Sequence, residues 1–252
     1  MTMAAYSPPR HFLAKVQRRL TQRTLARPVV LRFAEPVLSI TFDDFPASAA
    51  HEGADILERH GARGTYYAAA GLAGEDGPCG HNFTAADVTR LLANGHEIGC
   101  HTYAHTDCAK QSVFGTLQEL AQNRDALACM GASSALRTMA YPYGETTPAL
   151  KRSLPPRFAS ARGVAPGLNV GAADLAQLRA YAMFGKPFDA MRQALKRAAK
   201  RKAWVIGFTH DVSAAPSAWG TSAADLAALL THARDLGFVV LPVSAALDRR
   251  LP

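Results

Sequence analysis

The stretch that decides the fold is "ADILERHGARGTYYAAA", residues 54–70, where a helical pattern, a glycine and an apolar strand follow one another. The same order recurs in "ADVTRLLANGHEIGC", residues 86–100, and in "ADLAALLTHARDLGFVVLPV", residues 224–243. One glycine in each copy stands where the helix should end, because that position favours a positive φ: Gly61, Gly95 and Gly237. Helices that alternate with strands in this way predict parallel β/α units.

Apolar runs elsewhere in the chain predict further strands of the same sheet. They lie at residues 37–41, 138–141, 158–162 and 203–209. Helix starts are marked by Thr84 with Asp87 and by Ser222 with Asp225, each pair spaced as a capping box. Seven or eight such units in 252 residues favour a (β/α) barrel over an open sheet.

The composition is that of a globular and basic protein. Hydrophobic residues make up 48% of the chain and charged residues 19%, which excludes a disordered chain. The 28 Lys and Arg against 20 Asp and Glu give a formal net charge of +8. This balance favours acidic partners, but it does not choose between nucleic acid, anionic lipid and an acidic polymer. The four cysteines form no C-x-x-C pair, so we expect free thiols in a reducing compartment.

The first 35 residues differ from the rest, and we divide the chain into a basic amphipathic segment, 1–35, and a main domain, 36–252. Leu13, Val16 and Leu20 predict a short helix with an apolar stripe before Pro28 stops it, among seven arginines and lysines. No secretory apolar stretch and no run long enough to span a bilayer is present. The sequence as given therefore predicts a protein that is cytoplasmic or bound peripherally to the inner membrane.

A second basic segment is "KPFDAMRQALKRAAKRKA", residues 186–203. The favoured interpretation is a solvated barrel helix with its apolar side in the core. Contact with an anionic membrane surface is the alternative. Nucleic acid comes last and is not expected, because no aromatic stacking pattern or known motif accompanies the charge.

Two adjacent carboxylates end the first predicted strand in "SITFDDFP", residues 39–46, where Asp43 and Asp44 would repel each other without a cation. Partners occur in "GHEIGCHTYAHTDC", where His101 and His105 follow another predicted strand. One carboxylate and two imidazoles suit Zn²⁺ or a similar divalent ion and leave positions open for water and substrate. The neighbouring carboxylate could then take a proton from water on the metal, whose pKa falls from 15.7 toward about 7.

Two more polar groups follow predicted strands. Tyr143 lies in "AYPYG", residues 140–144, and His210 lies in "VIGFTHDV", residues 205–212. The C-terminal ends of barrel strands are where barrel enzymes hold their catalytic groups. The sequence therefore predicts that Tyr143 and His210 share one site with the two aspartates and the two histidines.

The motifs "TFDD", "HTYAH", "YPYG" and "FTH", in this order, resemble the polysaccharide deacetylases of the NodB-homology type, carbohydrate esterase family 4. The resemblance runs from about residue 37 to the end of the chain. It implies a distorted (β/α) barrel with about seven parallel strands and the metal-dependent removal of an acetyl group from an N-acetylated sugar.

The resemblance also implies a role for each matching residue. Asp43 corresponds to the general base, and Asp44, His101 and His105 correspond to the ligands of a divalent metal, with Zn²⁺ favoured over Co²⁺, Mn²⁺ or Ni²⁺. His210 corresponds to the general acid, and the backbone N–H of Tyr143 would stabilise the oxyanion. Phe208 stands where the family has an apolar pocket residue for the acetyl methyl. Tyr141 and Trp219 are the other candidate substrate contacts.

The sequence lacks an arginine that belongs to the family pattern. Many members carry one three residues before the position of Tyr143, where it orients the base, and here that position is Ala140. We expect Arg179 to supply the charge from a neighbouring strand, with Arg137 as the weaker candidate. Phe45 also replaces the glycine that usually follows TFDD.

The expected substrate is an N-acetylglucosamine-type sugar in a bacterial exopolysaccharide of the holdfast or biofilm kind, or in its lipid-linked precursor. The alternatives are a deformylase or an O-acetyl esterase on the same scaffold, or a sugar-binding protein that has lost turnover.

Overall fold

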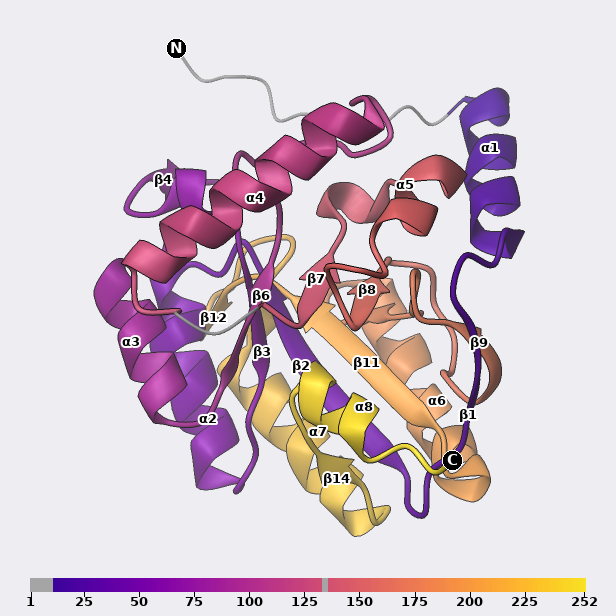
Figure 1. Ribbon diagram of the computed structural model, residues 1–252. Coiled ribbons are helices and arrows are strands. Elements are labelled where there is room, and N and C mark those ends of the chain that lie inside the picture. Colours follow the sequence, from indigo (N-terminus) through magenta and orange to yellow (C-terminus); the bar gives the residue numbers. More distant parts are fainter. Residues whose placement is uncertain (1–10, 133–135) are drawn as a thin grey trace.

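A curled sheet of parallel strands with helices around it forms the body of the structure, a computed structural model that describes residues 11–132 and 136–252 (Figure 1). The strand order is β10-β11-β2-β3-β6-β7-β8, and β14 pairs with β2 outside this path. Every neighbouring pair in the sheet is parallel. These features confirm the distorted (β/α) barrel with about seven parallel strands.

The strands of the main sheet are β2 (Val37–Asp43), β3 (Thr65–Ala68), β6 (Glu97–Cys100), β7 (Thr138–Ala140), β8 (Ser160–Arg162), β10 (Tyr181–Ala182), β11 (Trp204–Thr209) and β14 (Val239–Val240). Three two-stranded ladders join β1 (Pro28–Leu31) to β9 (Gly171–Asp174), β4 (Asp76–Gly77) to β5 (Gly80–His81), and β12 (Val212–Ser213) to β13 (Thr221–Ser222).

The α-helices are α1 (Phe12–Arg23), α2 (Ala54–Arg59), α3 (Ala85–Ala93), α4 (Val113–Cys129), α5 (Pro148–Ser153), α6 (Lys186–Arg201), α7 (Ala223–Asp235) and α8 (Val243–Asp248). Short helical turns of other types are η1 (Ala49–Gly53), η2 (Ala70–Leu72) and η3 (Pro142–Gly144). Among the described residues, no helix has the length and apolar character to cross a membrane.

The expected helix boundaries are confirmed. Gly61, Gly95 and Gly237 follow α2, α3 and α7 with φ values of 67°, 82° and 78°. At the start of α3, Thr84 and Asp87 each accept a hydrogen bond from the other's backbone N–H, which is a complete capping box. These local signals end each helix so that the chain can enter the next strand.

The core lies on both sides of β2, whose seven residues are all buried. The larger apolar cluster lies between the sheet and helices α2, α3, α4, α6 and α7, and a smaller one surrounds Trp204. Because both faces of β2 are covered, its last residue, Asp43, is held rigidly at the end of the barrel.

Part of the N-terminal segment packs into this same body. Strand β1 pairs with β9 in antiparallel register, and Leu31 and Phe33 belong to the cluster around Trp204. The division at residue 35 stays a prediction, but these contacts show that the residues just before it share the core of the barrel.

Helix α6 carries the second basic segment, and its apolar side faces the core. Phe188, Met191 and Leu195 are buried, whereas Lys196 and Arg197 are exposed. This arrangement is the solvated barrel helix that the sequence favours. Within the described part of the chain all four cysteines are free thiols, also as expected.

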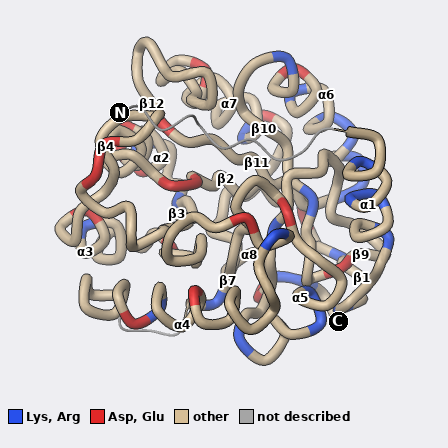
Figure 2. Tube along the Cα trace, turned by 90° about the horizontal axis from the view of Figure 1, so that it is seen from above, with Lys and Arg blue, Asp and Glu red and all other residues tan. Residues whose placement is uncertain are grey.

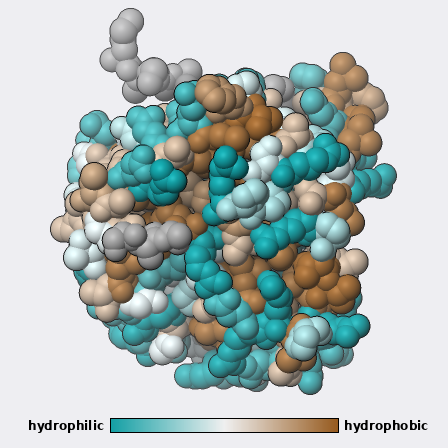
Figure 3. Space-filling view, in the orientation of Figure 1, coloured by the Kyte–Doolittle hydropathy of each residue, from teal (hydrophilic) through white to brown (hydrophobic). Residues whose placement is uncertain are grey.

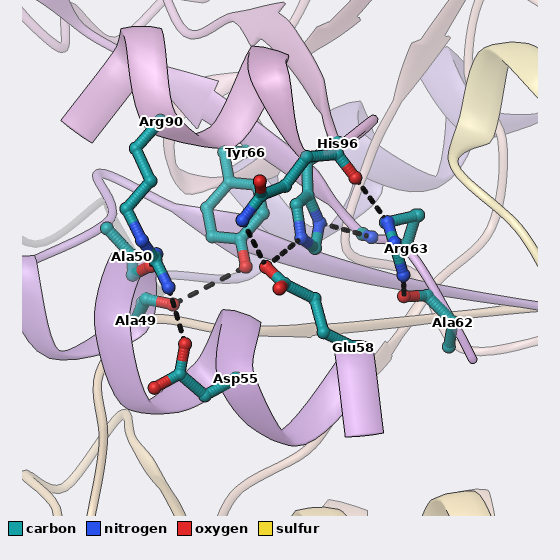
Figure 4. Close-up of polar contacts among 11 residues, drawn as sticks. Ala49, Ala50, Asp55, Glu58, Ala62, Arg63, Tyr66, Arg90 and His96 are labelled. Carbon is teal, nitrogen blue, oxygen red and sulfur yellow. Dashed lines mark hydrogen bonds and ion pairs between the residues drawn. The ribbon is translucent and has the colours of Figure 1, made fainter. Parts of the chain in front are cut away.

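A polar network away from the strand ends ties α2 to α3 and β3 (Figure 4). His96 is buried; its Nδ1 accepts from the Gly64 N–H at 3.0 Å, and its Nε2 lies 3.1 Å from Glu58 Oε1. Arg90 donates to the Ala50 carbonyl and pairs with Asp55. Burial lowers the pKa of His96, although Glu58 opposes that effect. His96 is therefore a packed structural histidine.

Candidate active site

The polar residues singled out in the sequence gather at the C-terminal end of the barrel. They follow β2, β6, β7 and β11, in that order: Asp43 and Asp44, His101 and His105, Tyr143, and His210. Parallel strands place their C-terminal ends at one rim, so these groups from distant parts of the chain share one site.

Asp44, His101 and His105 form a group whose ligand atoms all lie within 4.8 Å of one another. His101 Nε2 lies 3.9 Å from Asp44 Oδ1, and His105 Nε2 lies 3.4 Å from Asp44 Oδ2. His101 Nδ1 donates to the Ala140 carbonyl at 2.8 Å, and His105 Nδ1 lies 3.1 Å from the Tyr143 hydroxyl. Because His101 Nδ1 donates, the lone pair of that ring lies on Nε2, and the Nε2 atoms of both rings face Asp44.

The charge states of this group fit a divalent cation. Burial lowers the pKa of both His101 and His105 to about 4, so both rings are neutral near pH 7. Burial also raises the pKa of Asp44, and its Oδ1 is a buried atom without a hydrogen-bond partner among the described residues. A dication would satisfy that oxygen, and two imidazoles with one carboxylate are a donor set that Zn²⁺ takes at catalytic sites.

Strained backbone is concentrated at this site. Five non-glycine residues of the described chain have positive φ, and four of them are site residues: Asp44 at 53°, Thr102 at 61°, His105 at 53° and Tyr143 at 57°. Each such residue costs about 1–3 kcal/mol and persists only where surrounding contacts impose it. The site geometry is therefore imposed by the fold.

Glu119 on α4 imposes part of that geometry. Its Oε2 accepts from the backbone N–H of Tyr103 at 3.1 Å and from that of Ala104 at 2.9 Å. These two residues lie between the histidines His101 and His105, so the carboxylate holds the turn that brings the two rings together.

Replacing Glu119 by Ala is expected to weaken metal binding about 10–100-fold, the usual effect of losing a group that orients a ligand. Competition with a chromophoric chelator measures this change. Asp125→Ala, which removes an equal charge from an exposed position of α4, is the matched control and should bind metal normally. Equal affinity of the Glu119 and Asp125 variants would show that the turn holds without Glu119.

Asp43 is buried beside the metal-ligand group and pairs with Arg162 at the end of β8. Burial alone would raise the pKa of Asp43, but the Arg162 guanidinium, with His101 and His210, outweighs it and lowers that pKa. The guanidinium carbon lies 5.1 Å from the ring centroid of Tyr67 and 5.0 Å from that of Phe208. Asp43 is thus held as a carboxylate by an arginine that is fixed between two rings.

The expectation that Arg179 or Arg137 pairs with the base is wrong. Arg179 is exposed and donates to the Pro166 carbonyl, whereas Arg137 pairs with Asp248. Arg162 lies directly opposite Ala140 in the β7–β8 register, so its charge comes from the strand beside the expected position. The sequence held one signal for Arg162, because this arginine ends the predicted strand at residues 158–162.

His210 is oriented by the loop that follows β11. Its Nδ1 lies 3.2 Å from the Trp219 carbonyl oxygen, which can only accept, so Nδ1 carries the proton. The Nε2 atom is then the nitrogen that a substrate can reach. The His210 backbone N–H also donates to the Trp219 carbonyl at 3.2 Å, which fixes the histidine at two points.

The three expected substrate contacts lie in different surroundings. Tyr141 is 1% exposed and its hydroxyl donates to the Ala176 carbonyl at 2.8 Å, so it supports the fold and the expectation of substrate contact is wrong. Phe208 is 7% exposed, packed edge-on against Phe184. Trp219 is 43% exposed, and the carbonyl of the same residue orients His210.

A cavity of about 530 Å³ opens beside the loop that follows His210. Its lining comes from residues 46–48, just after Asp44, from Cys79 to His81 at the β4–β5 hairpin, and from the loop that starts at Asp211. Asp211 accepts from the Ser217 N–H at 2.8 Å and thereby closes that loop. The cavity therefore borders the segments that follow Asp44 and His210 in the chain.

Comparison with known proteins agrees with this fold. Residues 31–154 match the polysaccharide deacetylase family model. A chitin deacetylase of Pestalotiopsis sp is 34% identical over 89 residues, which are 35% of this chain and 28% of that protein. A bifunctional xylanase/deacetylase of Pseudobutyrivibrio xylanivorans is 31% identical over 78 residues, 31% of this chain and 12% of that protein. The matched regions thus cover less than a third of these relatives.

Solved structures show the same fold at low sequence identity. The chitin deacetylase of Colletotrichum lindemuthianum has a TM-score of 0.61 at 17% identity, covering 88% of this chain and 92% of that one. A family 4 carbohydrate esterase of Streptomyces lividans has a TM-score of 0.60 at 18% identity, covering 88% and 98%. A family 4 pseudoenzyme of Bacillus anthracis has a TM-score of 0.57 at 14% identity, covering 86% and 67%.

The fold is therefore a distorted (β/α) barrel with a group of possible metal ligands at the C-terminal ends of its strands. More narrowly, the chain carries a polysaccharide deacetylase domain of the NodB-homology type, carbohydrate esterase family 4.

Proposed function

We propose that this protein is a metal-dependent hydrolase that removes N-acetyl groups from N-acetylglucosamine-type sugars. The observation that carries this proposal is that a candidate metal ligand and a candidate base are adjacent residues at the end of β2. Beside two neutral histidines, Asp44 presents a carboxylate oxygen that has no hydrogen-bond partner among the described residues, and Arg162 keeps Asp43 ionised. A domain that only bound sugar would have no need of both a prepared base and a prepared metal-ligand group.

The residues divide the reaction among them. A divalent cation on Asp44, His101 and His105 would supply Lewis-acid polarisation of the acetyl carbonyl and a more acidic water. Asp43, as the general base, takes the proton of the attacking water. The backbone N–H of Tyr143 donates to the developing oxyanion. His210 protonates the leaving amine through Nε2, because its Nδ1–H is already given to the Trp219 carbonyl.

We propose an N-acetylated exopolysaccharide of the bacterial holdfast or biofilm type, or its lipid-linked precursor, as the substrate. The cavity of about 530 Å³, which borders the segments after Asp44 and His210, has room for a sugar residue, and Trp219 offers an exposed ring on which a sugar could stack. A net charge of +8 and two basic helices further support a peripheral contact with an anionic membrane, where a lipid-linked substrate would lie.

Acetate release from N-acetylglucosamine oligomers tests this function. We expect metal-stripped protein to be inactive and to recover with Zn²⁺, or with Co²⁺, Mn²⁺ or Ni²⁺ to different extents. Asp44→Ala should lose both metal binding and turnover, because two histidines without the carboxylate hold a dication poorly. Asp235→Ala, at an exposed position of α7, is the matched control and should behave as the wild type.

Parallel assays with an acetamide, a formamide and an acetyl ester of the same sugar separate the deacetylase from a deformylase or an O-acetyl esterase. A preference for the formamide or the ester would reassign the reaction while keeping the site. Tight metal binding without release of any acyl group would instead favour a domain that binds sugar without turnover.

A further inference from the structure

Helix α1 turns its apolar residues toward solvent. Phe12 is 76% exposed, Leu13 71%, Leu20 60% and Val16 37%. These residues lie within one face of the helix, because steps of three, four and seven positions return to the same side. An amphipathic helix usually buries that face. Figure 3 shows apolar side chains gathered over α1, at the upper right.

The opposite side of α1 packs against the barrel, and polar contacts hold it there. Lys151 is fully buried; its Nζ donates to the Thr21 carbonyl at 3.0 Å and lies 2.9 Å from Asp174 Oδ2. Thr21 is only 4% exposed, and Arg18 pairs with Glu145. The outward direction of the apolar face is therefore set by buried contacts that reach α1 from other parts of the chain.

Cations flank this apolar face. Lys15, Arg19 and Arg23 are exposed, and the helix sequence FLAKVQRRLTQR contains no acidic residue. In Figure 2, arginines and lysines gather along α1 and α6 on one side of the barrel. An apolar stripe bordered by cations is the pattern of helices that lie in the interface of an anionic bilayer.

We propose that α1 is a membrane-docking helix that binds the surface of an anionic lipid bilayer. Phe12, Leu13, Val16 and Leu20 enter the boundary between headgroups and acyl chains, and Lys15, Arg19 and Arg23 bind the anionic headgroups. This inference deepens the proposed membrane contact and rests on it, but it does not depend on deacetylase activity.

A second copy of this chain is a poorer occupant of the same face. Packing α1 against α1 would bring two sets of Lys15, Arg19 and Arg23 together, and neither helix has an acid to neutralise them. Like charges across an interface oppose association, whereas an anionic bilayer complements them.

The side of α1 that packs against the barrel lies close to the proposed site. Arg18 of α1 pairs with Glu145, which is two residues beyond Tyr143 in the chain. Figure 1 shows α1 beside α5, on the flank of the barrel near the C-terminal end of β7. A bilayer bound to α1 would therefore hold the site near lipid headgroups, where the sugar of a lipid-linked precursor is found.

Sedimentation of the whole chain with lipid vesicles tests this proposal. We expect binding to phosphatidylcholine vesicles that contain phosphatidylglycerol, little binding to phosphatidylcholine alone, and weaker binding at high salt. Two variants separate the apolar and charged contributions: Leu13→Gln with Leu20→Gln, and Lys15→Gln with Arg19→Gln and Arg23→Gln. Each should lower the vesicle partition coefficient at least about tenfold.

The matched control removes the same number of charges from the other basic helix. Lys196→Gln with Arg197→Gln and Lys200→Gln, all exposed on α6, should keep nearly full binding if α1 is the docking element. Equal loss in the α6 variant, or no vesicle binding by the wild type, would overturn the proposal. So would a dimer in sedimentation velocity that the Leu13→Gln/Leu20→Gln variant no longer forms.

Acetate release from soluble oligomers separates this proposal from the proposed function. Both α1 variants should retain it, because the helix face does not touch the site. Vesicle binding by a protein that releases no acetate would support the docking helix and contradict the deacetylase. Acetate release by a protein that does not bind vesicles would support the deacetylase and contradict the docking helix.

Discussion

Replacing Asp43 by Asn is expected to lower the rate of acetate release by about 10²–10⁴, the contribution of a general base, while the protein keeps its metal. The substituted amide has nearly the shape of the carboxylate but cannot accept a proton from water. The metal remains because its proposed ligands are Asp44, His101 and His105. Turnover kinetics and metal content measured on the same preparation test both halves of this expectation.

The adjacent variant, Asp44→Asn, is the matched control, since it makes the same chemical change one residue further along. It should lose metal and activity together, because Asp44 faces His105 at 3.4 Å whereas Asp43 pairs with Arg162. If Asp43→Asn also lost its metal, the division of roles between the two aspartates would be wrong. Activity retained in Asp43→Asn would show that another group acts as the base.

The site residues that the sequence could indicate are those whose chemistry is concentrated in short motifs. Asp43 with Asp44, and His101 with His105, stand at the ends of strands that the apolar pattern already predicts. In a parallel barrel those ends meet at one rim, so strand prediction alone brings the two motifs together.

Arg162 could not be assigned in this way, because its partnership depends on strand register. It lies 119 residues from Asp43 in the chain, and only the pairing of β7 with β8 places it opposite Ala140. The predicted strand at residues 158–162 was correct within two residues, yet nothing in its sequence says which neighbour it joins.

The apolar face of α1 illustrates a second limit of sequence patterns. The spacing of Leu13, Val16 and Leu20 predicts the helix, and α1 confirms it. The pattern does not say which side docks, since that is decided by Lys151 and Glu145, more than 120 residues away. Local periodicity predicts an amphipathic helix, whereas long-range polar contacts determine the face it presents.

Replacing Arg162 by Met is expected to lower activity and to move the acidic limb of the kcat/KM profile to higher pH. The base works only when ionised, and the Arg162 guanidinium is the main reason why the pKa of buried Asp43 is lowered. Without it, burial raises that pKa, so activity should be lost at a higher pH as the solution is acidified. An opposite charge at contact distance lowers a carboxyl pKa, so we expect the acidic limb of Arg162→Met to move to higher pH.

Rates measured from acidic to neutral pH give the position of this limb. A merely structural role of Arg162 would lower activity at every pH without moving the limb. Arg162→Lys is the conservative variant: it keeps a cation near Asp43, so its limb should lie between those of the wild type and Arg162→Met. An unshifted limb in Arg162→Met would show that another group sets the ionisation of the base.

The register of β7 and β8 allows a stricter test, in which the arginine is moved to the neighbouring strand. Ala140 and Arg162 are directly paired, so their side chains leave the sheet on the same side. Ala140→Arg in the Arg162→Met background would place a guanidinium where many family members carry theirs. We expect part of the activity to return and the acidic limb to move most of the way back to its wild-type pH. Recovery of neither, in a variant that folds and binds metal, would mean that Asp43 depends on the fixed position of Arg162 between Tyr67 and Phe208 as well as on its charge.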